Sequence, residues 1–194
     1  MLPPPGRRRV ESGPGLPRAC GTEAKVAALD PTDGKERWTV PLGGRRPVAA
    51  DAFVCFLSAE PTVLKVQEPM GHGVHAYLAF GQDGRRQGQI DVIGDDAAVA
   101  DGKLLVASGV VVAFDLATGD EVWSSDSLGT GRSITALHAG GGRVTVLTRS
   151  RKNHDELYVY DSATGDTVDE RTFSCDTDDR SWGVVAERYP DVRV

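Results

Sequence analysis

Cysteine and aromatic residues are scarce in this chain, which has three cysteines, three tryptophans and five phenylalanines in 194 residues. Cys20, Cys55 and Cys175 are odd in number and far apart, so neither a disulfide framework nor a zinc site is predicted. Cys55 lies in an apolar run and is interpreted as a small core residue. No apolar run reaches the roughly 18 residues of a membrane-spanning helix, so no membrane span is expected.

The first 22 residues also lack a periodic apolar pattern, and they are rich in proline. We expect residues 1–22 to form a disordered leader and residues 23–194 to form the folded domain. The basic run at residues 7–9 is not followed by the apolar core of a signal peptide. The sequence as written therefore predicts a cytoplasmic protein, with an envelope or extracytoplasmic location as the alternative if N-terminal sequence is missing.

A strong positive charge is absent as well. The formal net charge is −6, and the one tight basic run lies in the leader without interleaved aromatic residues. Nucleic-acid binding depends on clustered lysine and arginine. We therefore expect no nucleic-acid partner.

What the chain does have is a recurring acidic hairpin. Val112–Trp123 reads VAFDLATGDEVW, Val26–Trp38 reads VAALDPTDGKERW, and Leu157–Glu170 reads LYVYDSATGDTVDE. A worn copy, YLAFGQDGR, stands at Tyr77–Arg85. Each copy has an apolar strand, a turn with glycine, and the start of a second strand, so each predicts a β-hairpin.

Each residue type in the turn has a structural role. An aspartate that closes the first strand accepts hydrogen bonds from the backbone of the turn, and a threonine hydroxyl adds a similar bond. The glycine supplies a positive φ, and a tryptophan four residues later is expected to pack against the neighbouring sheet. The structural repeat residues are Asp30, Gly34, Trp38, Asp115, Thr118, Gly119, Trp123, Asp161, Thr164 and Gly165.

The frame Ala-x-Asp-x-x-Thr-Gly-x-x-x-Trp resembles the tryptophan-docking repeat of the PQQ-like β-propellers, which include quinoprotein dehydrogenases and many non-enzymatic propellers. The copy Ala113–Trp123 matches the frame fully. The copy at Ala28–Trp38 has Asp33 in the threonine position, and the third copy has Asp169 where the tryptophan should be.

This resemblance implies an all-β fold, a β-propeller of about four four-stranded blades. The repeats recur every 35 to 50 residues or so, near the usual blade period. Ser181–Glu187 and Pro190–Val194 are predicted strands, and we expect the last blade to be shared between N- and C-terminal strands. The chain is then either a small ring or arc or a piece of a larger propeller, and we favour the second.

Within the second repeat, strands are predicted at Pro47–Asp51 and Ala52–Leu57, and Val63–His75 is interpreted as a loop insertion. Propellers bind partners through loops on one rim. We therefore expect a protein or peptide partner to bind the rim loops Ser58–Gly73 and Ser150–Glu156.

The sequence assigns no catalytic, cofactor-binding or metal-binding residue. The candidates considered for metal binding are His72, His75, Asp176, Asp178 and Asp179. The two histidines lack a third ligand, and the aspartates lack the spacing of a calcium loop.

The predicted function is that of a non-catalytic binding, scaffold or sensor module. The alternative is a part of a PQQ-dependent quinoprotein dehydrogenase that binds PQQ and calcium. Those enzymes resemble this chain only in the docking repeat and carry an adjacent cysteine pair, whereas no two cysteines are adjacent here. A gene remnant without an independent role is the third hypothesis.

Overall fold

The computed structural model describes residues 15–19, 23–44, 46–69, 73–129, 132–150 and 154–174. These residues form fifteen strands in four antiparallel sheets, so the predicted all-β fold is confirmed. The chain divides into two compact units, Met1–Asp91 and Val92–Val194, each containing two sheets.

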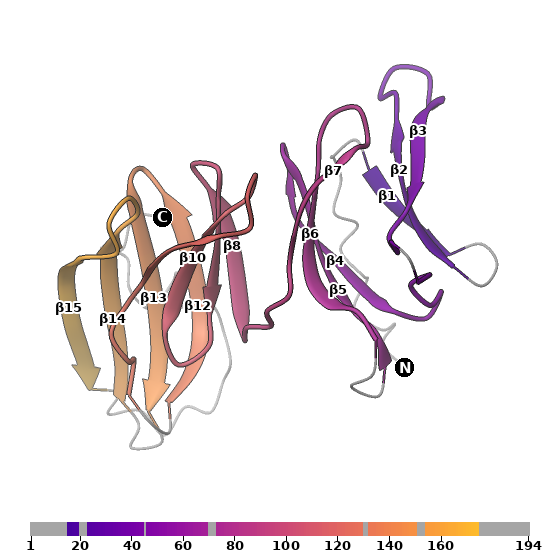
Figure 1. Cartoon of the computed structure of the whole chain (residues 1–194). Coiled ribbons are helices and arrows are strands. Elements are labelled where there is room, and N and C mark those ends of the chain that lie inside the picture. Colours follow the sequence, from indigo (N-terminus) through magenta and orange to yellow (C-terminus); the bar gives the residue numbers. More distant parts are fainter. Residues whose placement is uncertain are drawn as a thin grey trace, which may run out of the picture. The chain divides into compact units, whose positions relative to one another are not determined.

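The first unit holds the first and second sheets (Figure 1). The first sheet has three strands in the order β1-β2-β3, and the second has four in the order β4-β5-β6-β7. Their bounds are β1 Gly15–Ala19, β2 Ala24–Leu29, β3 Glu36–Pro41, β4 Phe53–Ala59, β5 Thr62–Gln67, β6 His75–Phe80 and β7 Arg86–Ile90.

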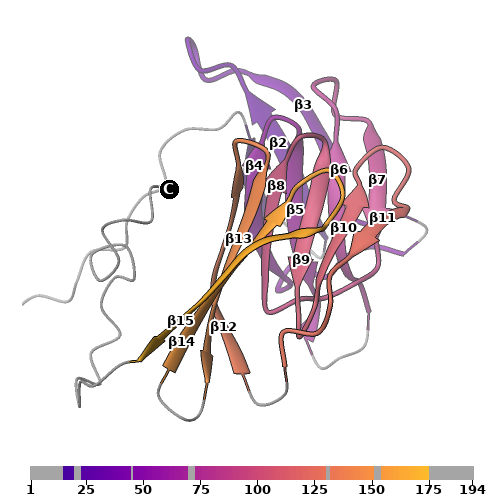
Figure 2. The same cartoon turned by 90° about the vertical axis from the view of Figure 1, so that its left-hand side faces the viewer.

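The second unit holds the third and fourth sheets, ordered β8-β9-β10-β11 and β12-β13-β14-β15 (Figure 2). Their bounds are β8 Asp96–Ala100, β9 Lys103–Ala107, β10 Val111–Asp115, β11 Glu121–Ser124, β12 Arg132–Gly140, β13 Arg143–Ser150, β14 His154–Asp161 and β15 Thr167–Ser174. Within each sheet, every strand pairs with the strands next to it in the sequence, as expected for a sheet repeated along the chain.

The last hairpin of every sheet has the same irregularity. The register shifts by one residue where the strand enters the turn, a β-bulge that increases local twist. The shifts fall at Ala28/Leu29, Ala79/Phe80, Ala113/Phe114 and Val159/Tyr160. The worn copy at Tyr77–Arg85 therefore keeps the backbone geometry of the better copies, although its sequence has drifted.

Each unit has its own apolar core between two sheets. In the first unit, Val26 and Leu42 pack with Leu64, Leu78 and Phe80 of the second sheet. We call this sheet-to-sheet packing the first seam.

In the second unit, Leu105 and Ala113 of the third sheet pack with Val146, Tyr158 and Tyr160 of the fourth. We call this packing the second seam. Alternate residues of the central strands face a seam, for example Leu64 and Val66 of β5 and Val144 and Val146 of β13, which is the period-two pattern of a strand.

The structure corrects two predictions in the second repeat. Pro47–Asp51 is not a strand. Val48 is fully buried in the core of the first unit, and Ala49 forms only an isolated β-bridge with Glu23. Thr62–Gln67, interpreted as loop, is strand β5. It lies between β4 and β6 and is buried along most of its length, so an apolar run here is a central strand and not an insertion.

Two further expectations concern the ends of the chain. Strand β1 lies within residues 1–22, the segment expected to be a disordered leader, and it pairs with β2. The expected strands at Ser181–Glu187 and Pro190–Val194 lie outside the described residues. No helix in the described part of the chain has the length and apolar character needed to cross a membrane.

Candidate functional site

In each acidic turn, backbone N–H groups of the turn donate hydrogen bonds to the aspartate carboxylate. Asp115 Oδ1 accepts the amide N–H groups of Ala117 at 2.8 Å and Thr118 at 2.9 Å. These amide bonds, chiefly that of Thr118, lower the pKa of Asp115. Thr118 Oγ1 accepts the amide of Asp120 at 3.2 Å, which closes the turn.

The turns at Asp161 and Asp30 repeat this arrangement. Asp161 Oδ1 accepts the amides of Ala163 at 2.9 Å and Thr164 at 3.3 Å, and the pKa of Asp161 is lowered mainly by the first bond. Asp30 Oδ1 accepts the amide and hydroxyl of Thr32, and the hydroxyl bond is the main reason that the pKa of Asp30 is strongly lowered. These three carboxylates therefore accept the hydrogen bonds that stabilise their turns.

In the second seam, one tryptophan joins two sheets. Trp123 of β11 is 8% exposed, and its Nε1 donates to the carbonyl of Ser162 in the β14–β15 turn at 3.1 Å. A Cβ built on Gly165 would lie 2.6 Å from ring atoms Cδ2 and Cε3 of Trp123. Gly165 has φ +79°, so its glycine serves both the turn and the close approach of the ring.

The first seam has the same joint. Trp38 of β3 donates from Nε1 to the carbonyl of Gln82 at 2.8 Å, in the β6–β7 turn. A Cβ on Gly84 would lie 2.7 Å from Cδ2 of Trp38. The worn repeat has therefore retained the glycine that receives the preceding tryptophan. Both rings pack against the next sheet, as the sequence predicts.

The tryptophan position is different in the other two sheets. Trp38 and Trp123 pair in register with Ala28 and Ala113. The same register position is occupied by Gly88 opposite Ala79 in the second sheet and by Asp169 opposite Val159 in the fourth.

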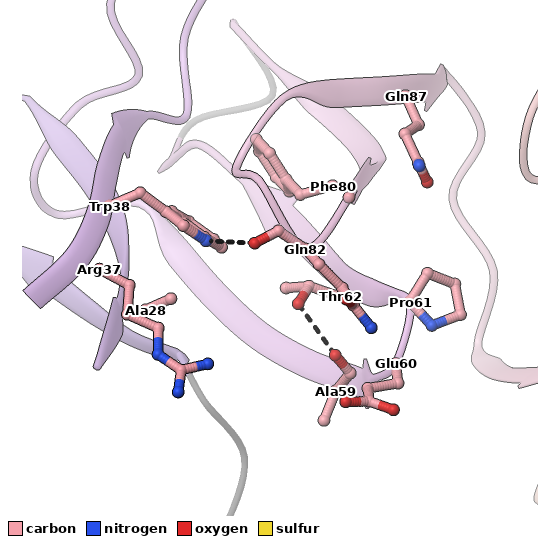
Figure 3. A pocket seen from close by; sticks show the side chains of 11 residues that line it. Ala28, Arg37, Trp38, Ala59, Glu60, Pro61, Thr62, Phe80, Gln82 and Gln87 are labelled. Atoms are coloured by element: carbon pink, nitrogen blue, oxygen red, sulfur yellow. Dashed lines mark hydrogen bonds between the residues drawn. The ribbon is translucent and has the colours of Figure 1, made fainter. Parts of the chain in front are cut away.

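A pocket of about 400 Å³ lies beside Trp38 at the first seam (Figure 3). Its walls come from four separate places in the first unit: strands β2 and β3, the β4–β5 turn, the β6–β7 turn, and β7. The lining residues are Ala28, Arg37, Trp38, Ala59, Glu60, Pro61, Thr62, Phe80, Gly81, Gln82 and Gln87.

The charged groups of this pocket are differently engaged. Arg37 donates from Nε and Nη2 to Asp30 Oδ2, at 3.2 and 2.7 Å. Glu60 makes no hydrogen bond or ion pair with any described residue. Figure 3 shows Arg37 and Glu60 extending from facing sides, from β3 and from the β4–β5 turn. The pocket thus offers a carboxylate beside an already paired guanidinium.

A network of polar side chains lies at the second seam. Arg132 Nη2 donates to Glu156 Oε1 at 2.7 Å, and Tyr158 donates its hydroxyl to Glu156 Oε2 at 2.5 Å. His154 Nε2 lies 3.2 Å from Glu156 Oε1. Burial, and then the Glu156 bond, raises the pKa of Tyr158 to about 12. Because each carboxylate oxygen of Glu156 already has a donor, this network is suited to holding the strands together.

Of the remaining metal-binding candidates, the structure describes only His75. His72, Asp176, Asp178 and Asp179 lie outside the described residues. The ring nitrogens of His75 are buried without a hydrogen bond to the described part of the chain. Among the described residues, no three histidine, cysteine, aspartate or glutamate side chains are placed to hold a metal ion.

Sequence reasoning missed the pocket and the Glu156 network. Glu60 and Gln82 carry no local signal, because the pocket exists only where segments distant in sequence meet. The network had a weak signal: His154, Glu156 and Tyr158 alternate along β14 and so share one face.

Repeated antiparallel sheets with bulged hairpins, joined in each unit by a tryptophan that packs on the following sheet, define a β-propeller built from PQQ-type repeats. A family model described as outer membrane protein assembly factor BamB matches residues 22–182. The chain belongs to this family, which confirms the resemblance seen in the docking repeats.

Several solved structures are similar to this chain. Kluyvelomyces marxianus Hsv2, a β-propeller, is 16% identical over 84% of this chain and 50% of its own, with a TM-score of 0.50. BamB from Moraxella catarrhalis is 16% identical over 78% of this chain and 58% of its own, at TM-score 0.44. Quinohemoprotein alcohol dehydrogenase ADHIIG from Pseudomonas putida HK5 is 23% identical over 68% of this chain and 21% of its own, at TM-score 0.43.

This chain spans less than two thirds of each of these three structures. No curated protein matches it.

Proposed function

We propose that the chain is a non-catalytic binding module that holds a protein partner at the first seam, around the pocket beside Trp38. One observation carries this proposal. The pocket is lined by groups with spare hydrogen-bonding capacity, the carboxylate of Glu60 and the side-chain amides of Gln82 and Gln87, next to an indole. Indole walls with a few polar groups are typical of recognition sites.

The repeated turns support a structural role for the other carboxylates. Asp30, Asp115 and Asp161 accept backbone hydrogen bonds in the same way in three places. A catalytic carboxylate would be expected once in a chain, with its acceptor atoms directed at a substrate.

We place the partner at the first seam and not along the whole of the two predicted rim loops. Half of Ser58–Gly73 is strand, because it contains the end of β4 and all of β5. In Ser150–Glu156, residues 151–153 lie outside the description, and Asp155 and Glu156 are buried in strand β14. The exposed part of Ser58–Gly73 that lines the pocket is the turn at Glu60 and Pro61.

The dehydrogenase alternative would require this chain to help bind PQQ and calcium. PQQ and calcium would require a cluster of oxygen ligands. The described carboxylates are instead distributed among turns and ion pairs, and no three of them with histidine or cysteine surround a metal position.

The test is site-specific photo-crosslinking in native extract. A benzoylphenylalanine placed at Gln82, at the pocket, should crosslink a discrete protein, whereas the same group at the 49%-exposed Val168 of β15 should not. Equal products from both positions would contradict a partner at the seam. A stoichiometric quinone absorbance with dye reduction, after addition of PQQ and calcium, would contradict the non-catalytic assignment.

A further inference from the structure

The two seams differ beside their tryptophans. In the second seam, the hydroxyl of Ser162, whose carbonyl receives Trp123, donates to Asp101 Oδ2 at 3.4 Å. In the first seam, the carbonyl of Gln82 receives Trp38, but the Gln82 side chain makes no bond within the described residues. The pocket is therefore open at the place where the second seam has a contact between side chains.

The free charge of the pocket is negative. Arg37 is paired with Asp30 through two hydrogen bonds to one carboxylate oxygen, and the Thr32 hydroxyl, followed by Arg37, holds the pKa of Asp30 well below its usual range. Glu60 has no such partner in the described chain. A cationic ligand is thus favoured over an anionic or neutral one.

The apolar walls suit the stem of a long basic side chain. Trp38, Pro61 and Phe80 line the pocket together with the polar groups. Lysine and arginine place their methylene groups on apolar surface and keep the charged end among polar groups. A volume of about 400 Å³ is at the lower end of small-ligand sites, about 300 to 1,000 Å³, and is ample for one such side chain.

We propose that this pocket binds a lysine or arginine side chain presented by an extended segment of a protein partner. The charged end pairs with Glu60, the methylene groups lie against Trp38 and Pro61, and Arg37 Nη1, which is not used by Asp30, donates to a backbone carbonyl of the segment. This inference rests on the proposed function and specifies its ligand.

The test uses small probes and amide NMR spectra of the whole chain. N-acetyl-arginine amide and N-acetyl-lysine amide should shift the Trp38 indole N–H and the Gln82 and Gln87 side-chain resonances, saturably and less at high salt. N-acetyl-glutamine amide and the neutral sugar maltose, which are uncharged, and N-acetyl-glutamate amide, which is acidic, should not shift these resonances. Saturable shifts at the pocket with maltose or the glutamine probe, equal to those with the basic probes, would overturn the proposal.

Two variants separate charge from shape. Glu60→Gln keeps the side-chain volume and should weaken the basic probes about two- to fivefold, as expected for an ion pair at an exposed carboxylate. Glu121→Gln, the same change at an exposed residue of β11, should leave binding unchanged. Undiminished binding to Glu60→Gln would contradict the ligand assignment.

The two proposals fail in different ways. If Gln82 crosslinks a partner but the basic probes do not bind, the binding module stands and the basic ligand is wrong. If the probes bind but no partner crosslinks, the pocket chemistry stands and the protein-binding function is wrong.

Discussion

The indole of Trp123 lies against the backbone of Gly165, so close that a Cβ at residue 165 would be 2.6 Å from two ring atoms. The same relationship joins Trp38 and Gly84 in the other unit. A glycine chosen for turn geometry in one sheet is thus also the surface that receives the tryptophan of the sheet before it.

Gly165→Ala should destabilise the second unit more than its backbone conformation alone explains. Gly165 and Gly34 both have positive φ, +79° and +72°, but a Cβ at Gly34 meets nothing within 4 Å. Gly34→Ala should therefore cost only about 1 to 2 kcal/mol, the price of a left-handed conformation. Gly165→Ala should cost about 1 to 3 kcal/mol more because the indole must move.

Urea unfolding of the two variants measures this difference. Equal losses in the free energy of unfolding would show that the ring does not lie on Gly165.

Removing a docking ring should be costly, and more so at the buried position. Trp123→Ala should lower the free energy of unfolding by about 3 to 5 kcal/mol, the usual range for a buried tryptophan. Trp38 is only half-buried, so Trp38→Ala should cost less. Denaturant unfolding of the two variants, followed by far-ultraviolet circular dichroism, makes the comparison. A larger loss for Trp38→Ala would contradict the burial order.

The hairpins were predictable because their chemistry is local. An aspartate, a glycine four residues later and apolar residues before them suffice to specify the turn, as at Asp115 and Gly119. The partner of each tryptophan was predictable only as "the next sheet". Nothing in the sequence near Trp38 indicates the carbonyl of Gln82, which lies 44 residues away.

Strand β5 was missed for a related reason. Its residues Thr62–Gln67 run directly into Glu68 and the segment with proline and glycine that follows. Most of the strand was therefore assigned to the same loop as that segment. The core partners of Leu64 and Val66 are in other segments, and their burial is visible only in three dimensions.

Acid should weaken the turns through their aspartates. The pKa of Asp115 is lowered in the folded chain, mainly by the Thr118 amide bond, relative to about 3.9 when unfolded. The ionised carboxylate therefore stabilises the fold above about pH 4, and this contribution is lost as the pH falls through the lower folded value.

Asp115→Asn keeps an oxygen that accepts the turn bonds but does not titrate. The variant should lose less stability than the wild type between about pH 4 and pH 2. Thermal unfolding across this range is the measurement, with Asp169→Asn, at an exposed pair, as the control. Parallel pH profiles for wild type and Asp115→Asn would contradict the assignment.

Tyr158 should ionise unusually late. Burial and the Glu156 bond raise its pKa to about 12, so stability held by the neutral phenol is present below about pH 10 and lost as the pH rises towards 12. Burial also raises the pKa of Tyr160, so absorbance titration at 295 nm should show late-ionising tyrosines whose number falls by one in Tyr158→Phe. Glu156→Gln should move the Tyr158 step to lower pH; an unchanged step would show that Glu156 does not contribute.

The Glu156 network should matter more than an exposed ion pair. The Glu156 side chain is 7% exposed and Arg132 24%, so Glu156→Ala leaves a largely desolvated guanidinium and should cost about 3 kcal/mol. Asp169→Ala, which breaks the exposed pair with Arg171, should change stability by less than about 1 kcal/mol. Similar losses in urea unfolding would contradict a buried network.

The pairing of each tryptophan with the glycine turn of the next sheet is tested most directly by proton NMR of the chain in solution. The account predicts cross-relaxation between the indole protons of Trp123 and the α-protons of Gly165, and likewise between Trp38 and Gly84. It also predicts upfield glycine shifts that vanish in Trp123→Leu and Trp38→Leu. Glycine α-protons at ordinary shifts, without cross-peaks to either indole, would contradict it.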